Sequence, residues 1–265
     1  MKRLALVALL FVACSDRQPA SPPPTPPTAS LTPPKQPLPA FAIPPTTKLL
    51  VTAIVDDWTS TQATLRVWRR AGTAWEAKGD AWPGVVGGTG IAWGIGLHGA
   101  GAPGREGPLK KEGDGKSPAG VFAIDAAYGV AKDPPKGTKL PYETTAHGDW
   151  QCVDDPASDH YARIVDRKQV PADWQSHEEM LRNDTLYTWV VNVAHNPGHV
   201  PGKGSCIFLH VWGGKDSTTV GCTAMEEPRL AALIPQLDPA DQPLYVLLPR
   251  AEYSALASIW GLPAQ

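Results

Sequence analysis

The chain has few cysteines, little net charge and no apolar run long enough to cross a membrane. Its four cysteines include no Cys-x-x-Cys pair, its histidines form no His-Glu-x-x-His motif, and the formal net charge is −2. These absences argue against a metal site, a thiol–disulfide enzyme and a nucleic-acid partner. The apolar run at residues 4–13 is too short at ~1.5 Å of rise per residue to cross a hydrocarbon core of ~30 Å. We therefore expect no membrane-spanning helix, no metal and no cofactor.

The N-terminus has the order of residues found in an export signal. Lys2 and Arg3 precede the apolar run, which ends at Cys14 after small residues. This junction resembles a bacterial lipoprotein processing site, so residues 1–13 are predicted to be a signal peptide and Cys14 to become lipidated. An ordinary secretory signal with a coincidental cysteine is the alternative. In both cases we expect the protein outside the cytoplasm, and we favour the periplasmic face of the outer membrane.

Residues 14–47 consist largely of Pro, Ala, Thr and Ser and contain little apolar bulk. Such a composition favours an extended, semi-rigid spacer between a membrane anchor and a folded part. We expect one domain at residues 48–250, followed by a C-terminal tail at 251–265, which is either a short helix or frayed. The chain is expected to be a monomer.

Short strands and frequent turns dominate the predicted domain. We expect strands at residues 48–55, 63–69, 75–82, 121–124, 187–194, 206–212 and 244–248. Glycine and proline are frequent between residues 83 and 120 and indicate short strands joined by tight turns. Helices are predicted only at residues 173–182 and 227–237. The fold class is therefore mainly β, with a sandwich or barrel-like core and a few short helices.

Residues 204–225 combine a histidine on a predicted strand with a cysteine in a glycine-rich loop. A thiol becomes a strong nucleophile when it ionises, and a nearby imidazole favours that ionisation. His210 shares its face of the strand with Phe208 and Trp212, which can fix its orientation. Gly221 permits a sharp turn directly before Cys222. Because no acidic residue lies nearby in the sequence, we expect a backbone carbonyl as the third partner of His210.

The same stretch resembles the active-site signature of the L,D-transpeptidase catalytic domain, a strand-borne His followed by Ser/Thr-x-Gly-Cys. Here these residues are His210, Thr219, Gly221 and Cys222. Three further stretches resemble a branch of that family: Gly-Asp-Gly-x-x-Pro-x-Gly-x-Phe at 113–122, Cys-x-Asp-Asp-Pro-x-Ser at 152–158 and Gly-Ser-x-Ile-Phe-Leu-His at 204–210. The resemblance implies an L,D-transpeptidase-like β fold.

The resemblance also implies a reaction on peptidoglycan. Cys222 would attack the diaminopimelate–D-alanine bond of a tetrapeptide stem, release D-alanine and pass the acyl group to an amine. His210 would act as general base and then acid, and the backbone N–H groups of Gly221 and Cys222 would stabilise the oxyanion. Cross-linking or remodelling of the cell wall would follow.

Substrate contacts are expected at Thr219, Val220 and Trp212. Much of the family has His where this chain has Val220, and often Arg or Asn where it has Ala224. These two departures concern the substrate and the acceptor, since neither position holds the attacking atom. Asp154 and Asp155 are interpreted as turn-capping residues.

Cys152 and Cys206 are the disulfide candidates once Cys222 is assigned as the nucleophile. A bridge at Cys206 would brace the strand that carries His210. Two buried free thiols, or a pairing of Cys222 with either cysteine, remain the alternatives.

Two other functions fit the same sequence. A hydrolase would pass the acyl group to water, as an L,D-carboxypeptidase or endopeptidase acting on the same bonds. A non-catalytic, peptidoglycan-binding lipoprotein would keep the fold without turnover, although pure binding has no need for both His210 and Cys222.

Overall fold

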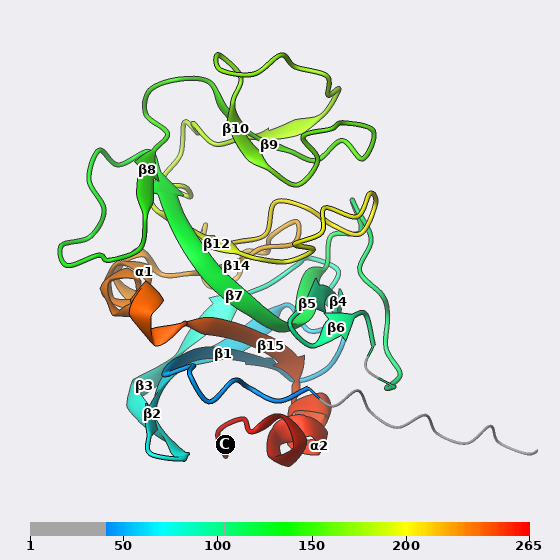
Figure 1. Ribbon diagram of the computed structural model, residues 1–265, viewed down its shortest axis with the longest axis vertical. Helices are drawn as coiled ribbons and strands as arrows, with labels where there is room; N and C mark the ends of the chain where they lie inside the picture. Colours follow the sequence, from blue (N-terminus) through cyan, green and yellow to red (C-terminus); the bar gives the residue numbers. More distant parts are fainter. Residues whose placement is uncertain (1–40, 103) are drawn as a thin grey trace, which may run out of the picture. The chain divides into compact units, whose positions relative to one another are not determined.

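The computed structural model describes residues 41–102 and 104–265, so the predictions for the signal peptide, for Cys14 and for most of the tether lie outside the described residues. The main sheet has ten strands, and eight of them form its closed part: β1 (Leu49–Val55), β2 (Gln62–Ala71), β3 (Ala74–Val85), β7 (Ser117–Gly129), β12 (Val190–Val193), β13 (Phe208–Val211), β14 (Thr223–Met225) and β15 (Leu244–Pro249). They follow the order β12-β13-β14-β3-β2-β1-β15-β7, and β12 pairs with β7 as well as with β13. The sheet therefore closes on itself, which confirms the mainly β, barrel-like core (Figure 1).

The apolar pattern of each strand explains its place in the closed sheet. All seven residues of β1 and all six of β15 are buried, as expected for strands covered on both faces. These two strands pair in parallel, while β2 alternates between buried and exposed residues in its first half. Helix α2 (Arg250–Trp260) follows β15 directly and covers it and β1.

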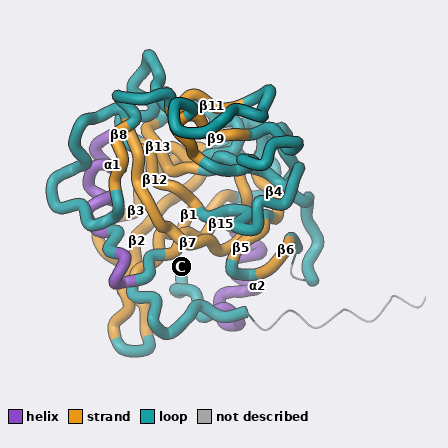
Figure 2. The backbone as a smooth tube through the Cα atoms, turned by 45° about the horizontal axis from the view of Figure 1, so that its top comes forward, coloured by secondary structure: helices purple, strands orange, loops and turns teal. Residues whose placement is uncertain are grey.

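The remaining strands are short and lie outside the closed sheet: β4 (Ile91–Trp93), β5 (Ile95–Gly96), β6 (Gly99–Ala100), β8 (Tyr142–Thr144), β9 (Trp150–Val153), β10 (Ile164–Asp166) and β11 (His177–Glu179). The first three confirm the short strands expected between residues 83 and 120. Strands β10, β9 and β11 form a small sheet of their own. This small sheet lies at the end of the domain opposite α2 (Figures 1 and 2).

One predicted helix is wrong and the other is shortened. Residues 173–182 contain strand β11, because His177, Glu178 and Glu179 pair with β9. This long-range pairing overrides the local helical pattern. Helix α1 (Glu227–Leu233) begins as predicted but continues as the 3-10 turn η1 (Ile234–Gln236), since Pro235 has no N–H for a helical bond. A second 3-10 turn is η2 (Pro239–Asp241).

Both predicted boundaries of the domain need correction. The N–H of Ile43 donates to the carbonyl of Trp260 at 2.8 Å, and the Phe41 ring lies 5.2 Å from the Trp260 ring. The end of the predicted tether therefore packs on the domain. At the other end, helix α2 confirms the short helix that was one of the two alternatives for the tail, and its Tyr253, Leu256 and Trp260 are buried in the main core. In the part of the chain that the structure describes, no helix is long and apolar enough to span a membrane.

Candidate active site

The register of two neighbouring strands brings His210 and Cys222 together. Strands β13 and β14 are parallel, with Leu209 opposite Thr223 and His210 opposite Ala224. Cys222 directly precedes β14 and is therefore level with Phe208, whose N–H donates to Cys222 Sγ at 3.3 Å. Because side chains alternate along a strand, His210 and Cys222 face the same side. Both residues line one cavity.

The turn before the cysteine is held by two hydroxyl groups. Thr219 Oγ1 and Ser117 Oγ each donate to the carbonyl oxygen of Cys222 at 2.7 Å. Gly221 has φ +156°, and a Cβ there would lie 3.3 Å from the carbonyl of Lys116. Its N–H donates to Thr219 Oγ1 at 3.2 Å. This contact is a correction to the expected oxyanion role of Gly221, because its N–H is already used within the turn.

The imidazole of His210 is held as a neutral base. Its Nδ1 lies 2.7 Å from the carbonyl oxygen of Val211. Since a carbonyl only accepts, Nδ1 carries the proton and Nε2 keeps a free lone pair. Burial lowers the pKa of His210 to about 4, against the Val211 hydrogen bond, which raises it. The imidazole is therefore uncharged at neutral pH and able to accept a proton.

The thiol of Cys222 is also held in its neutral form. Burial raises the pKa of Cys222, and the nearby Glu178 carboxylate raises it further, while the N–H of Phe208 lowers it. The thiol donates to the carbonyl oxygen of Cys206 at 3.5 Å. The site thus contains a neutral thiol and a neutral imidazole, not the preformed thiolate that the sequence suggested.

A chain of polar side chains surrounds this pair. The Tyr187 ring packs edge-on against His210 with 5.2 Å between centroids, and its hydroxyl donates to Glu178. Burial raises the pKa of Glu178. The Arg182 guanidinium lies 5.1 Å from the centre of the Tyr187 ring and forms an ion pair with Asp184 at 2.7 Å. In this network the charge of Glu178 acts on the Cys222 thiol, and that of Asp184 acts on the His210 imidazole.

Two cavities meet at Cys222. The first, the His210-side cavity, has a volume of about 220 Å³ and is lined by Glu178, Arg182, Leu186, Tyr187, His210, Thr218, Thr219, Val220 and Cys222. The second, the Ile207-side cavity, has a volume of about 310 Å³ and is lined by Lys110, Glu112, Gly113, Gly115, Asp154, Glu178, Ser205, Cys206, Ile207, Val220, Gly221 and Cys222. Three residues belong to both: Glu178, Val220 and Cys222. A substrate can therefore extend to both sides of the sulfur.

The structure brings most of the predicted site residues together. Thr219 and Val220 line the His210-side cavity, and Val220 is 79% exposed at the rim of both. The Thr219 hydroxyl, however, stabilises the turn before Cys222 by donating to the Cys222 carbonyl oxygen. Trp212 lines neither cavity, and its backbone N–H donates to the carbonyl oxygen of Met225 at 2.8 Å.

Cys152 and Cys206 form a disulfide that joins the small sheet to the segment before β13. Cys206 itself has φ +53°, a conformation that a non-glycine residue adopts only when its surroundings hold it. The bridge lies four residues before His210, so it fixes the small sheet next to the reactive pair. Cys222 is the one free cysteine among the described residues.

Three acidic residues of the Ile207-side cavity were missed or misread from the sequence. Glu112 lies next to the Gly-Asp-Gly turn and accepts hydrogen bonds from Tyr161 and Ser205. Asp154 was interpreted as a turn cap, but its Oδ1 is buried and has no hydrogen-bond partner among the described residues. Its neighbour Asp155 does cap a turn, because its carboxylate accepts hydrogen bonds from the N–H groups of Ala157 and Gln175. Only the pairing of β11 with β9 brings Glu178 to the site.

The His, Cys, Asp and Glu side chains of the described residues do not form a metal centre. Among the described residues there is no group of three or more His, Cys, Asp or Glu side chains placed to hold a metal ion. The site chemistry available from these side chains is proton transfer by His210 and nucleophilic attack by Cys222.

Comparison with known proteins gives one match. The sequence model of the L,D-transpeptidase catalytic domain (YkuD) matches residues 52–246, which run from within β1 to within β15 and include His210 and Cys222. No curated protein and no solved structure matches the chain significantly.

The protonation state of Cys222 can be measured by alkylation. We expect iodoacetamide to modify Cys222 in the folded chain more slowly at pH 7 than in the urea-unfolded chain, because only the thiolate reacts and burial raises the pKa. The rate in the folded chain should continue to rise above pH 9. Peptide mapping by mass spectrometry separates this site from the other cysteines. A fast reaction with a plateau between pH 5 and 7 would instead indicate a preformed thiolate–imidazolium pair.

Proposed function

The chain belongs to the L,D-transpeptidase catalytic-domain family, which acts on peptidoglycan, and from this we propose that it is a Cys222-dependent acyltransferase of tetrapeptide stems. The observation that carries the proposal is that a buried thiol and a neutral imidazole, whose Nδ1 is bound to the Val211 carbonyl, line the same cavity. The transferred group is the acyl part of the third stem residue, and the leaving group is D-alanine.

The reaction begins with transfer of the thiol proton to His210 Nε2 as Sγ attacks the scissile carbonyl carbon. A C–S bond forms and the carbonyl oxygen becomes an oxyanion. As the oxyanion collapses, the C–N bond breaks, and Nε2 returns its proton to the departing amine. The resulting thioester is attacked by an acceptor amine, whose proton passes to Nε2 and then to the sulfur. The backbone donor for the oxyanion is the N–H of Cys222, because that of Gly221 is used by Thr219.

Burial opposes ionisation of the Cys222 thiol, and substrate binding overcomes this opposition. Both groups are neutral before the reaction, so a thiolate forms only when the proton transfer is coupled to attack on a carbonyl. The Phe208 N–H, 3.3 Å from Sγ, stabilises the negative charge that develops there. This arrangement limits side reactions of the thiol with other electrophiles.

The two cavities have different chemistry and therefore take different parts of the substrates. Proton transfer to the leaving amine and from the acceptor amine requires both amines to be on the side of His210. The acyl part of the donor stem then occupies the Ile207-side cavity. There Glu112, Asp154 and Glu178 match the side-chain ammonium of a diamino acid such as diaminopimelate. Asp154 Oδ1 is the acceptor without a partner in the described residues.

The mechanism predicts that Cys222→Ala abolishes turnover while the far-UV circular dichroism of the chain stays unchanged. His210→Ala should lower kcat by at least ~100-fold, because general acid–base catalysis contributes 10²–10⁴-fold. His147→Ala, at an exposed histidine, is the matched control and should behave as the wild type. Incubation with a tetrapeptide muropeptide, followed by intact-mass analysis, detects the acyl-enzyme and released D-alanine.

The same assay separates the alternatives. A product in which the acyl group joins a second stem supports the transferase. Free tripeptide as the sole product would identify an L,D-carboxypeptidase, and turnover retained in Cys222→Ala would refute the mechanism. Absence of both adduct and product from a folded wild-type chain would leave the non-catalytic binding lipoprotein.

The acidic residues of the Ile207-side cavity predict that the enzyme requires the side-chain amine of the third stem residue. Asp154→Asn should raise KM for the tetrapeptide by about tenfold, since a hydrogen bond to a charged group is lost. A tetrapeptide with that amine acetylated should be a poor substrate for the wild type and equally poor for the variant. Asp159→Asn, at a nearby exposed carboxylate, is the control. Equal KM values for the free and the acetylated amine would contradict this placement of the donor.

The export signal and Cys14 support a lipid-anchored protein on the periplasmic side of the cell envelope, with the outer membrane as the favoured site. The Cys152–Cys206 disulfide is consistent with an oxidising compartment. Labelled palmitate should be incorporated into the wild type but not into Cys14→Ser, which should move to the soluble fraction. Incorporation into both would place the lipid elsewhere, and incorporation into neither would favour an ordinary secretory signal.

A further inference from the structure

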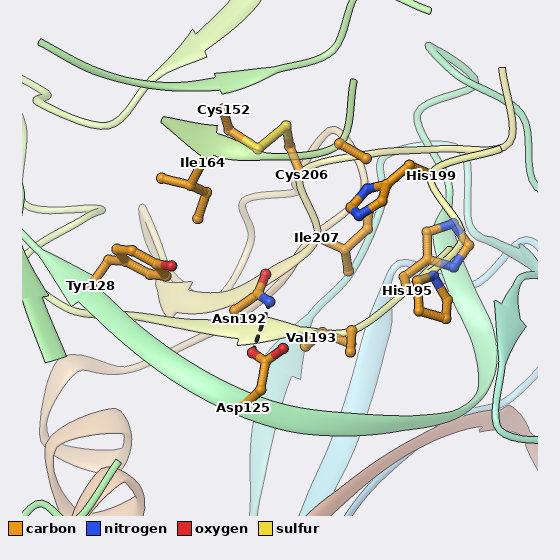
Figure 3. A pocket seen from close by; sticks show the side chains of 13 residues that line it. Asp125, Tyr128, Cys152, Ile164, Asn192, Val193, His195, His199, Cys206 and Ile207 are labelled. Atoms are coloured by element: carbon orange, nitrogen blue, oxygen red, sulfur yellow. Dashed lines mark hydrogen bonds between the residues drawn. A yellow bond between two sulfur atoms is a disulfide. The ribbon is translucent and has the colours of Figure 1, made fainter. Parts of the chain in front are cut away.

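A third cavity, of about 200 Å³, lies beside the active site (Figure 3). It shares Cys206 and Ile207 with the Ile207-side cavity but does not include Cys222. Its walls come from β7, from β12 and the loop that follows, and from the small sheet with its disulfide. We call it the β7–β12 cavity. None of the steps described so far uses it.

An irregularity in the sheet directs two polar side chains to this cavity. Val191 pairs with Ala127 and Val193 pairs with Ile124, so Asn192 faces two residues of β7, Asp125 and Ala126. Such a bulge turns side chains away from the regular alternation and is frequent near functional sites. Here Asn192 Nδ2 donates to Asp125 Oδ1 at 2.8 Å. Among the described residues, Asp125 Oδ2 and Asn192 Oδ1 make no hydrogen bond and remain as acceptors.

Two further polar groups lie at opposite sides of the cavity in Figure 3. The Tyr128 ring provides an aromatic surface, and burial together with the nearby Asp125 raises the pKa of its hydroxyl, which therefore stays a donor. His199 Nδ1 is buried without a hydrogen-bond partner among the described residues. Buried polar atoms are nearly always paired, so this nitrogen indicates a missing partner. Ile164 and Val193 add apolar surface between these groups.

The residues that line the β7–β12 cavity indicate which class of ligand it binds. No Lys or Arg lines the cavity, so an anion would find no counter-charge. The carboxylate of Asp125 is already paired with an amide, and no metal-binding group of three side chains occurs among the described residues. Acceptors, a phenol donor and an aromatic face with some apolar surface suit a neutral ring that carries hydroxyl and amide groups.

From these observations we infer that the β7–β12 cavity binds an N-acetylated sugar of the glycan strand to which the donor stem is attached. The connection to the stem rests on the proposed function. The donor acyl group occupies the Ile207-side cavity, and the stem continues past Cys206 and Ile207 towards its sugar. The enzyme then prefers stems that are still attached to glycan over free peptides, and the disulfide fixes the wall between the two cavities.

The test uses the full chain and two substrates, a free tetrapeptide and the same tetrapeptide on a GlcNAc–MurNAc disaccharide. The wild type should show a kcat/KM about tenfold higher for the disaccharide form, as expected for one or two added hydrogen bonds to a charged or polar group. In Asp125→Ala and Asn192→Ala this ratio should fall towards one. Asp56→Ala removes an exposed carboxylate with a single ion-pair partner, Arg250, outside the three cavities, and should keep the wild-type ratio.

Binding of the peptide-free disaccharide, followed by NMR titration, separates the sugar site from the reaction. Saturable binding that is lost in Asp125→Ala supports the site even if neither peptide substrate is turned over, a result that would reject the proposed reaction alone. Absence of disaccharide binding to the wild type overturns the inference. A ratio near one in the wild type, or an unchanged ratio in both variants, also overturns it.

Discussion

The parallel register of β13 and β14 is the constraint on which the site depends. It sets Cys222 level with Phe208, which lies two residues before His210 on β13. The Phe208 N–H can therefore contact the sulfur. A slip by one residue would turn one of the two reactive side chains to the opposite face. The closed sheet prevents such a slip, because β13 is paired on its other edge with β12, and β12 is paired with β7.

Burial then determines the chemistry of the pair. The same core that fixes the geometry removes water from both groups, lowers the pKa of His210 and raises that of Cys222. Desolvation outweighs the mutual attraction that would favour a thiolate–imidazolium pair. The carbonyl of Val211 replaces a carboxylate as the partner of Nδ1, and it orients the ring without adding negative charge. Both groups therefore keep their neutral forms at neutral pH.

The small sheet β10-β9-β11 supplies walls to two of the three cavities. It contributes Glu178 and, just beyond β9, Asp154 to the Ile207-side cavity, and β10 contributes Ile164 to the β7–β12 cavity. The Cys152–Cys206 bridge joins the sheet to the chain segment that separates these cavities. Three cavities adjoin along one segment, Ser205 to His210, and the functions proposed above assign to them a leaving group, a diamino acid and a sugar in succession.

The sequence by itself determined most strands of the closed sheet, the start of helix α1 and the His210–Cys222 motif, because each depends on residues that are close along the chain. Alternation of apolar residues follows from the geometry of a strand, and the motif lies within a single strand–loop unit. The tertiary structure alone decided that residues 173–182 pair with β9, that Gly221 gives its N–H to Thr219, and that residues 251–265 belong to the core. It also decided that Asp154 and Asp155 have different roles, and that a bulge directs Asp125 and Asn192 to one cavity. These features arise from contacts between residues far apart in the chain, and the burial and pairing such contacts impose cannot be derived from local spacing.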